Sequence, residues 1–109
     1  MKVYLAGPMR GIPEFNFPLV KSAAKDLRQR GMLVFSPAER DLNRDHFDPL
    51  HDEAKTLRYY MQYDLRAVCK CDAVVVLPNW KKSQGARLEV YVARECEIPI
   101  LRYPDLAEV

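Results

Sequence analysis

The chain has 109 residues, of which 49% are hydrophobic and 29% are charged. This length and composition indicate one soluble globular domain and exclude a disordered or fibrous protein. Seventeen lysines and arginines face fifteen aspartates and glutamates, which leaves a formal net charge of +2. A surface that follows a nucleic-acid polymer usually shows a clear cationic excess, so we expect a small anionic ligand rather than DNA or RNA.

The apolar segments and the cysteines predict a cytoplasmic protein. The apolar N-terminal residues run directly into a Gly-Pro turn, which leaves too short a core for a signal peptide. The longest uninterrupted apolar run, residues 73–77, is far below the roughly 20 residues that cross a bilayer. Cys69, Cys71 and Cys96 have neither the spacing of a disulfide framework nor that of a metal site. We therefore expect reduced, mostly packed thiols, no metal, no cofactor and no membrane partner.

The hydrophobic pattern predicts strands that alternate with helices. In chain order, the expected strands cover residues 3–6, 32–35, 72–77 and 98–103. Helical spacing predicts helices over residues 15–30, 53–69 and 84–97. The first helix is expected to end at Gly31 and the third to begin after Ser83 as its N-cap. Residues 39–52 lack a clear period and are expected to form a surface loop.

Alternating strands and helices predict a single α/β domain over residues 1–109. We expect a Rossmann-like fold with flavodoxin-like order, in which about four to five mostly parallel strands are flanked by helices. Right-handed crossovers place the first and third strands side by side, with the second and fourth outside them. Ligands of such sheets bind beyond the carboxyl ends of the strands, here formed by residues 7–11, 36–52 and 78–85.

Two acidic side chains fall on the apolar faces of the expected helices. At about 100° per residue, Asp64 lies on the same face as Val68, and Glu89 lies among the apolar positions of its helix, between Cys96 and Ala93. The simpler alternative is an acid at the edge of the core, held by an arginine or a loop. Because both acids flank one central strand, we favour a site. Two carboxylates in one cleft suit glycosidic chemistry, since one can attack or stabilise the anomeric carbon while the other handles protons.

Two glycine-containing loops at the same sheet edge could hold an anion. Ser83 and Gly85 open the third helix, whose free amides and dipole favour a negative charge. An ordinary serine N-cap is the alternative. In the loop after the first strand, Arg10 could donate paired hydrogen bonds to a phosphate or carboxylate. Trp80, the single tryptophan, could stack on a base or simply cover the core.

Three motifs resemble the nucleoside 2-deoxyribosyltransferase-like superfamily. They are Val-Tyr-Leu-Ala-Gly-Pro-Met-Arg-Gly at residues 3–11, Cys-Asp-Ala-Val-Val-Val at residues 71–76, and Ser-x-Gly-x-x-x-Glu at residues 83–89. Within the superfamily, the chain is most similar to small phage and prophage members and resembles the 2′-deoxynucleoside 5′-monophosphate N-glycosidases. The resemblance implies that Glu89 is the nucleophile that forms a glycosyl-enzyme intermediate. It also implies that Asp64 assists protonation and positions the sugar.

The resemblance implies the remaining substrate contacts as well. Phosphate contacts are implied for Arg10, Gly11, Ser83 and Gly85, and sugar or base contacts for Gly7 and Met9. Members of the superfamily are usually homodimers or larger homo-oligomers, in which a neighbouring subunit closes the site. The fuller transferases carry further structure after the fourth strand, which favours a smaller hydrolase or nucleotide-binding protein here.

We therefore expect an N-glycosidase that hydrolyses the N-glycosidic bond of a nucleoside or deoxynucleoside 5′-monophosphate. Its partner would be a small nucleoside or nucleotide. Two alternatives stay open: a deoxyribosyltransferase that exchanges one base for another, and a nucleotide sensor that binds without turnover. The residues leave the identity of the base and the choice between ribose and deoxyribose open.

Overall fold

The computed structural model describes residues 1–8, 16–37, 39 and 56–109. The strands are β1 (Lys2–Ala6), β2 (Leu33–Phe35), β3 (Ala73–Val76), β4 (Ile100–Arg102) and β5 (Ala107–Glu108). The helices are α1 (Phe17–Gln29), α3 (Leu57–Cys69), the short 3-10 helix η2 (Trp80–Lys82) and α4 (Gln84–Glu95). Among the described residues, no helix combines the length and the apolar character that crossing a membrane requires.

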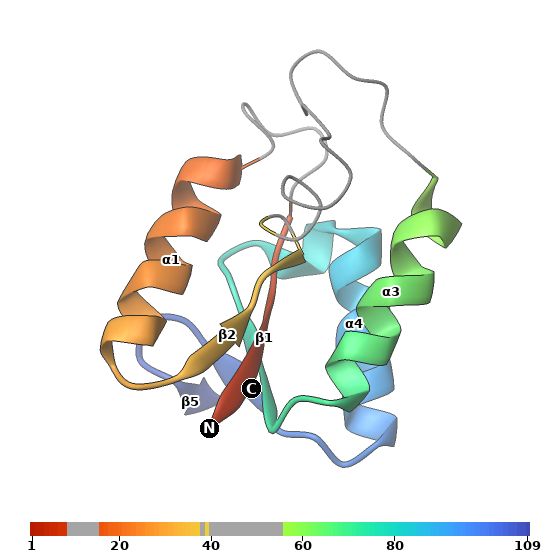
Figure 1. The fold of residues 1–109 in the computed structure, drawn as a ribbon. Helices are drawn as coiled ribbons and strands as arrows, with labels where there is room; N and C mark the ends of the chain where they lie inside the picture. Colours follow the sequence, from red (N-terminus) through yellow and green to blue (C-terminus); the bar gives the residue numbers. More distant parts are fainter. Residues whose placement is uncertain (9–15, 38, 40–55) are drawn as a thin grey trace.

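The sheet confirms the expected strand order. Its five strands are arranged β2-β1-β3-β4-β5, and the first four run parallel. β1 and β3 lie side by side in the middle, with Tyr4 opposite Val74. β5 pairs antiparallel with β4 and was not predicted, because two residues are too few to show a period. Figure 1 shows α1 on one face of the sheet and α3 with α4 on the other.

Alternation along β1 divides the core into two layers. Val3 and Leu5 pack in the layer that contains α1. Tyr4 and Ala6 pack in the layer that contains α3 and α4. Successive side chains of a strand point to opposite faces of the sheet. The Tyr4 hydroxyl therefore lies in the layer that contains α3 and α4, the helices that carry Asp64 and Glu89. β3 is buried along its whole length, as expected for a central strand.

The helix ends show which local signals were interpreted correctly. Pro18 lies in the first turn of α1, and Gly31 follows its end with a φ of 93°, as expected. α3 begins at Leu57, four residues later than predicted, because the extended Thr56 caps it by accepting a hydrogen bond from the Tyr59 amide. α4 ends at Glu95 rather than at Glu97, whose φ of 60° lies in the left-handed region.

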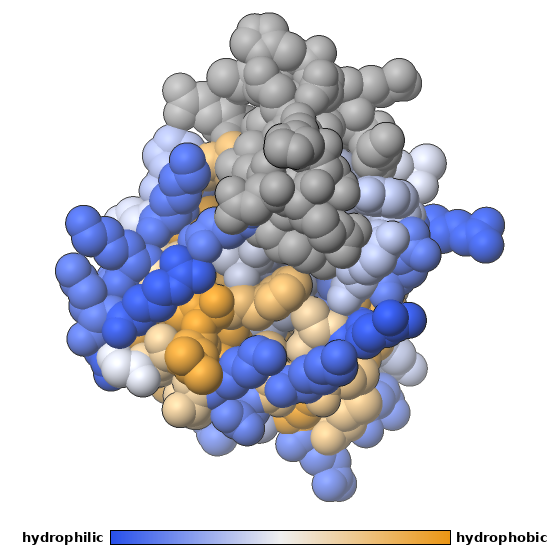
Figure 2. Space-filling view, in the orientation of Figure 1, coloured by the Kyte–Doolittle hydropathy of each residue, from blue (hydrophilic) through white to orange (hydrophobic). Residues whose placement is uncertain are grey.

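The edge strand β2 leaves apolar surface exposed. The Leu33 side chain is 70% exposed and Met1 is 57% exposed. The Leu33 amide donates a hydrogen bond to the Met1 carbonyl, which places the two residues together. Figure 2 shows hydrophobic surface in the lower half of the face on which β2 lies, bordered by charged side chains.

The cysteines differ from the expectation of packed thiols. Cys71 is buried as expected, but Cys69 and Cys96 are exposed. Cys96 lies on the apolar stripe of α4, yet it follows the last helical residue, where the stripe passes beyond the core. Helical periodicity alone therefore overestimated its burial.

Candidate active site

Two buried carboxylates lie on neighbouring helices of one layer. Asp64 of α3 is 4% exposed and Glu89 of α4 is 5% exposed. These values confirm the helix faces predicted from the sequence. α3 and α4 pack directly against each other, and α4 also contacts β1 and β3. Because burial of a carboxylate is costly unless it is hydrogen-bonded, each acid needs a specific polar environment.

Tyr4 supplies part of that environment for Glu89. The Tyr4 hydroxyl donates a hydrogen bond to Oε2 of Glu89. Tyr4 is fully buried, and its ring stacks on Phe35 with 5.5 Å between ring centroids. A hydroxyl held by a packed ring fixes the orientation of the carboxylate that accepts its hydrogen bond. The arrangement therefore presents a fixed carboxylate in a layer otherwise made of apolar side chains.

Sequence reasoning missed Tyr4 as a functional side chain. The signal was present, because a single tyrosine inside an apolar strand needs a partner for its hydroxyl. Which partner it meets depends on the pairing of β1 with β3 and on the packing of α4 over both strands. The strand pattern alone contains neither piece of information.

Ser83 and Gly85 form the start of α4. The Ser83 hydroxyl accepts a hydrogen bond of 3.1 Å from the Ala86 amide, so Ser83 is the N-cap that the sequence predicts. A β-carbon added at Gly85 would lie 3.4 Å from Cε of Met61 and 3.6 Å from Cδ1 of Leu57. The first turn of α4 therefore lies against α3. A phosphate contact at either residue stays a prediction.

Gly7 permits a close approach of two strand ends. A β-carbon there would lie 2.8 Å from Cβ of Leu77, which is closer than two carbons can pack. The Leu77 amide also donates a hydrogen bond of 2.8 Å to the Ala6 carbonyl. Gly7 is therefore required by packing, and its predicted contact with a sugar is untested. Met9, Arg10 and Gly11 lie outside the described residues, as do residues 40–52 of the expected loop.

Trp80 packs against the same buried cluster as Tyr4. The Lys81 ammonium lies 5.8 Å from the centre of the Trp80 ring. This arrangement fits the interpretation of Trp80 as an aromatic cover over the core. Base stacking by Trp80 stays a prediction.

Ser36 is a further polar side chain at the carboxyl end of the sheet. It follows β2 directly and is 4% exposed. Within the part of the chain that the structure describes, its hydroxyl oxygen is buried without a hydrogen-bond partner. Such a group commonly marks a place where water or a ligand completes the hydrogen bonding. The sequence placed Ser36 on the expected rim but did not single it out.

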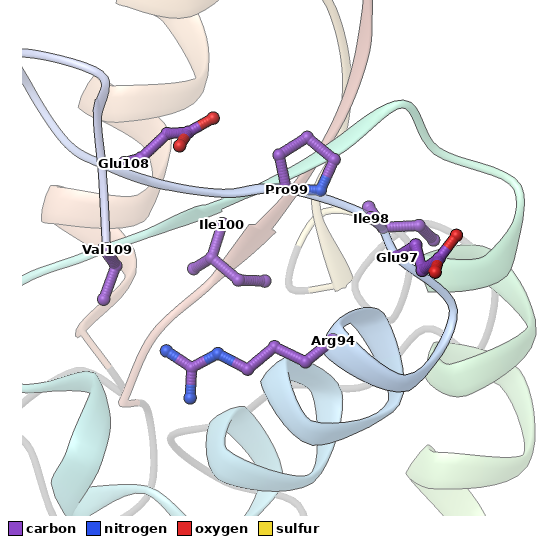
Figure 3. Close-up of a pocket in the computed structure, with 7 residues that line it drawn as sticks. All are labelled: Arg94, Glu97, Ile98, Pro99, Ile100, Glu108 and Val109. Atoms are coloured by element: carbon purple, nitrogen blue, oxygen red, sulfur yellow. The ribbon is translucent and has the colours of Figure 1, made fainter.

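One pocket lies away from the carboxylates. It has a volume of about 260 Å³ and lies where α4 ends and β4 begins. Figure 3 shows the Arg94 side chain extending beneath Ile100 toward Val109. The lining residues are Arg94, Glu97, Ile98, Pro99, Ile100, Glu108 and Val109. Across the described ranges, no group of three or more histidine, cysteine, aspartate or glutamate side chains is arranged to hold a metal ion.

The fold is similar to that of a solved 2-deoxyribosyltransferase. The chain is similar to a 2-deoxyribosyltransferase from Bacillus psychrosaccharolyticus, described as a biocatalyst for the synthesis of antiviral and antitumoral nucleosides. The TM-score is 0.68 at 22% identity, over 94% of this chain and 71% of that one. A conserved protein from Enterococcus faecalis V583 is similar with a TM-score of 0.66 and 22% identity, over 94% of this chain and 62% of that one.

A family model matches almost the whole chain. The protein belongs to the family described as domain of unknown function DUF4406, whose model matches residues 1–102. No match was found among proteins with curated descriptions. The resemblance to 2-deoxyribosyltransferases that the sequence suggested is therefore confirmed for the fold alone.

Proposed function

We propose that this protein cleaves the N-glycosidic bond of a nucleoside 5′-monophosphate, with Glu89 as the nucleophile. The observation that carries the proposal is the buried Glu89 carboxylate, oriented by the Tyr4 hydroxyl beneath the first turns of α4. The fold shared with a 2-deoxyribosyltransferase supports a nucleoside as the substrate class. The phage-type and N-glycosidase assignments rest on the sequence resemblance.

The proposed reaction uses the two buried acids in different roles. Glu89 attacks C1′ of the sugar as the bond to the base breaks, which forms a glycosyl-enzyme ester. Asp64, on the adjacent helix, positions the sugar and assists protonation of the departing base. Water then hydrolyses the ester and restores the Glu89 carboxylate. Each step needs only the acids and water, so the proposal includes no cofactor.

The phosphate is proposed to lie at the start of α4. Ser83 and Gly85 lie at the N-terminal end of α4, where backbone amides of the first turn can donate to an anion and the positive end of the helix dipole favours one. Lys81 and Lys82, which precede the N-cap, add positive charge near this end. Arg10 and Gly11 are proposed to contribute further donors. A neighbouring subunit of a homodimer is expected to close the site.

Deoxyribosyl transfer is the second candidate. The chain has the fold of a protein described as a 2-deoxyribosyltransferase, and this observation favours it. Transfer and hydrolysis share the first step and differ in whether a second base or water resolves the glycosyl-enzyme. A sensor that binds nucleotide without turnover would use the same pocket.

A panel of nucleosides and their 5′-monophosphates separates these functions. Purified protein is incubated with each compound, and free base is measured by chromatography with and without a second base. We expect base release that requires the monophosphate. Exchange faster than hydrolysis would assign the transferase, and tight binding with no product would assign the sensor.

Glu89→Gln tests the nucleophile, and Glu95→Gln is its matched control. Both residues lie on α4, but Glu95 is exposed and is the last residue of the helix, six positions after Glu89. We expect Glu89→Gln to abolish base release and Glu95→Gln to leave it unchanged. Mass spectrometry of the quenched wild-type reaction should show a sugar ester on the peptide that contains Glu89. Undiminished release by Glu89→Gln would refute the proposed role.

A further inference from the structure

Two exposed thiols lie at the ends of the helices that carry the buried acids. Cys69 is the last residue of α3, and Cys96 is the C-cap of α4. Both are exposed, whereas Cys71 is buried. α3 and α4 run in the same direction along one face of the sheet, so their carboxyl ends lie at the same end of the molecule (Figure 1).

Packing brings these two helix ends together. Val68 of α3 and Ala93 of α4 are both fully buried in one cluster. The Cys96 amide donates a hydrogen bond of 3.0 Å to the Val92 carbonyl, so Cys96 continues the last turn of α4. In a helical turn, the residue that follows Ala93 by three positions shares its face. Cys96 therefore lies on the same side of α4 as Ala93, the side that packs in the cluster shared with Val68 of α3.

The two thiols lie close together. Desolvation, followed by hydrogen bonding to the neighbouring Cys69 side chain, raises the pKa of Cys96 above that of an ordinary thiol. Burial likewise raises the pKa of Cys71. An oxidant in solution can reach two exposed thiols that lie close together, whereas Cys71 is buried.

We propose that Cys69 and Cys96 are an oxidation site, at which a hydroperoxide forms a disulfide that clamps α3 to α4. The Cys69 sulfur attacks the terminal peroxide oxygen, the O–O bond breaks, and a sulfenic acid and an alcohol (water, for hydrogen peroxide) are formed. The Cys96 sulfur then attacks the sulfenic sulfur, its proton is transferred to the departing hydroxide, and water leaves. In total, two thiols are oxidised by two electrons and one hydroperoxide is reduced.

The clamp ties together the two helices that carry Asp64 and Glu89, at the end away from the start of α4. It closes a loop that includes β3, η2 and all of α4. A cross-link of this kind mainly restricts the unfolded chain. Oxidation should therefore stabilise the fold whatever reaction the site performs, and the inference does not depend on the proposed function.

Peptide mapping of the whole protein tests the pair. The protein is treated with hydrogen peroxide, its remaining thiols are alkylated, and it is digested with trypsin without reduction. Cleavage after Lys70 separates Cys69 from Cys71. We expect peptide 67–70 to be linked to peptide 95–102, with the loss of two hydrogens and full reversal by dithiothreitol. Sulfinic acids on separate peptides, links between two molecules, or links through Cys71 would overturn the proposal.

Thermal unfolding provides a second, independent measurement. Oxidised wild-type protein should show a Tm about 10 °C above that of the reduced protein. Cys69→Ser and Cys96→Ser should each show no such increase after the same treatment, which controls for oxidation elsewhere. A linked peptide pair without a rise in Tm would overturn the clamp, because a disulfide that fits the folded state must stabilise it.

Discussion

The two faces of the sheet carry layers of very different character. All the residues that α1 buries are apolar: Phe17, Val20, Ala23, Ala24 and Leu27. The opposite layer buries Asp64 and Val68 from α3, and Ala86, Glu89, Val90 and Ala93 from α4. One layer thus contributes apolar burial alone, while the other also accommodates two carboxylates and the Tyr4 hydroxyl. The difference teaches that one face of the sheet serves the stability of the fold, while the other face also carries the candidate catalytic groups.

This separation predicts that substitutions in the two layers have opposite signatures. In the α1 layer, a truncated side chain should reduce the free energy of unfolding and spare the intrinsic rate of the folded protein. In the α3 and α4 layer, a conservative polar change should reduce the rate with little loss of stability. The following changes test the contrast, from the largest expected effect to the smallest.

Glu89→Gln should have the largest effect. Loss of the nucleophile should lower kcat for base release by about 10³-fold or more, because the glutamine cannot form the glycosyl ester. Thermal unfolding should show a Tm equal to or above that of the wild type, since a buried charge is removed and an acceptor for Tyr4 is kept. A large drop in Tm would show that Glu89 is mainly a structural residue.

Leu27→Ala should have the largest effect on stability. Leu27 is fully buried in the α1 layer, and its truncation should cost about 2–5 kcal/mol in the free energy of unfolding. Urea denaturation measures this loss. Leu33→Ala is the matched control, because the Leu33 side chain is 70% exposed and its truncation should change the free energy by less than about 0.5 kcal/mol.

Tyr4→Phe tests the orientation of the carboxylate. The phenylalanine keeps the stacked ring but removes the hydrogen bond to Glu89. A hydrogen bond to a charged group contributes about 1.5–3 kcal/mol, so kcat should fall by about 10- to 100-fold. KM should change little, because Tyr4 acts through Glu89. A fall confined to stability, with kcat unchanged, would assign the tyrosine to packing alone.

Ser83→Ala and Thr56→Ala form a matched pair of N-cap changes. Each hydroxyl accepts a hydrogen bond from an amide in the first turn of its helix. Each change should therefore cost about 1 kcal/mol in the free energy of unfolding, measured with urea. Ser83→Ala alone should also raise KM for a nucleoside monophosphate, and an equal effect of Thr56→Ala on KM would remove Ser83 from the phosphate site.

The smallest expected effect concerns the stability of the folded protein at acidic pH, through the contact of Arg102 with Asp105. The Arg102 side chain hydrogen-bonds Asp105 and so lowers the pKa of that carboxyl below its ordinary value. A carboxyl with a lowered pKa stabilises the folded state above about pH 4, and this contribution is lost as the pH falls further. Asp105→Asn should therefore make stability slightly less dependent on pH below about pH 4. Urea midpoints measured from neutral to acidic pH will check this.

The periodic features of the molecule were predictable from the sequence. Helical spacing placed Asp64 and Glu89 on buried faces, and the handedness of strand crossovers predicted the order β2-β1-β3-β4. Both inferences use patterns that repeat over many residues, so errors at single positions cancel. The N-caps are local signals, and here Ser83 was identified while Thr56 was overlooked.

Other features depend on contacts between distant segments. The hydrogen bond from Tyr4 to Glu89 joins a strand to a helix at the opposite end of the sequence. The pairing of β5 with β4 requires the chain to turn back after Arg102. The exposure of Cys96 depends on where the core stops beneath α4. Each of these follows from tertiary packing, which a pattern along the chain does not encode.

The short strand β5 also bears on how the protein behaves at high concentration. A sheet that ended at β4 would expose a row of unpaired backbone groups on which another chain could align. β5 covers this row with two residues in the opposite direction, and both of them are exposed. A strand so short, with a charged Glu108, is a poor template for further strands. Deleting β5 should therefore promote association of sheets into aggregates, an outcome that light scattering would detect.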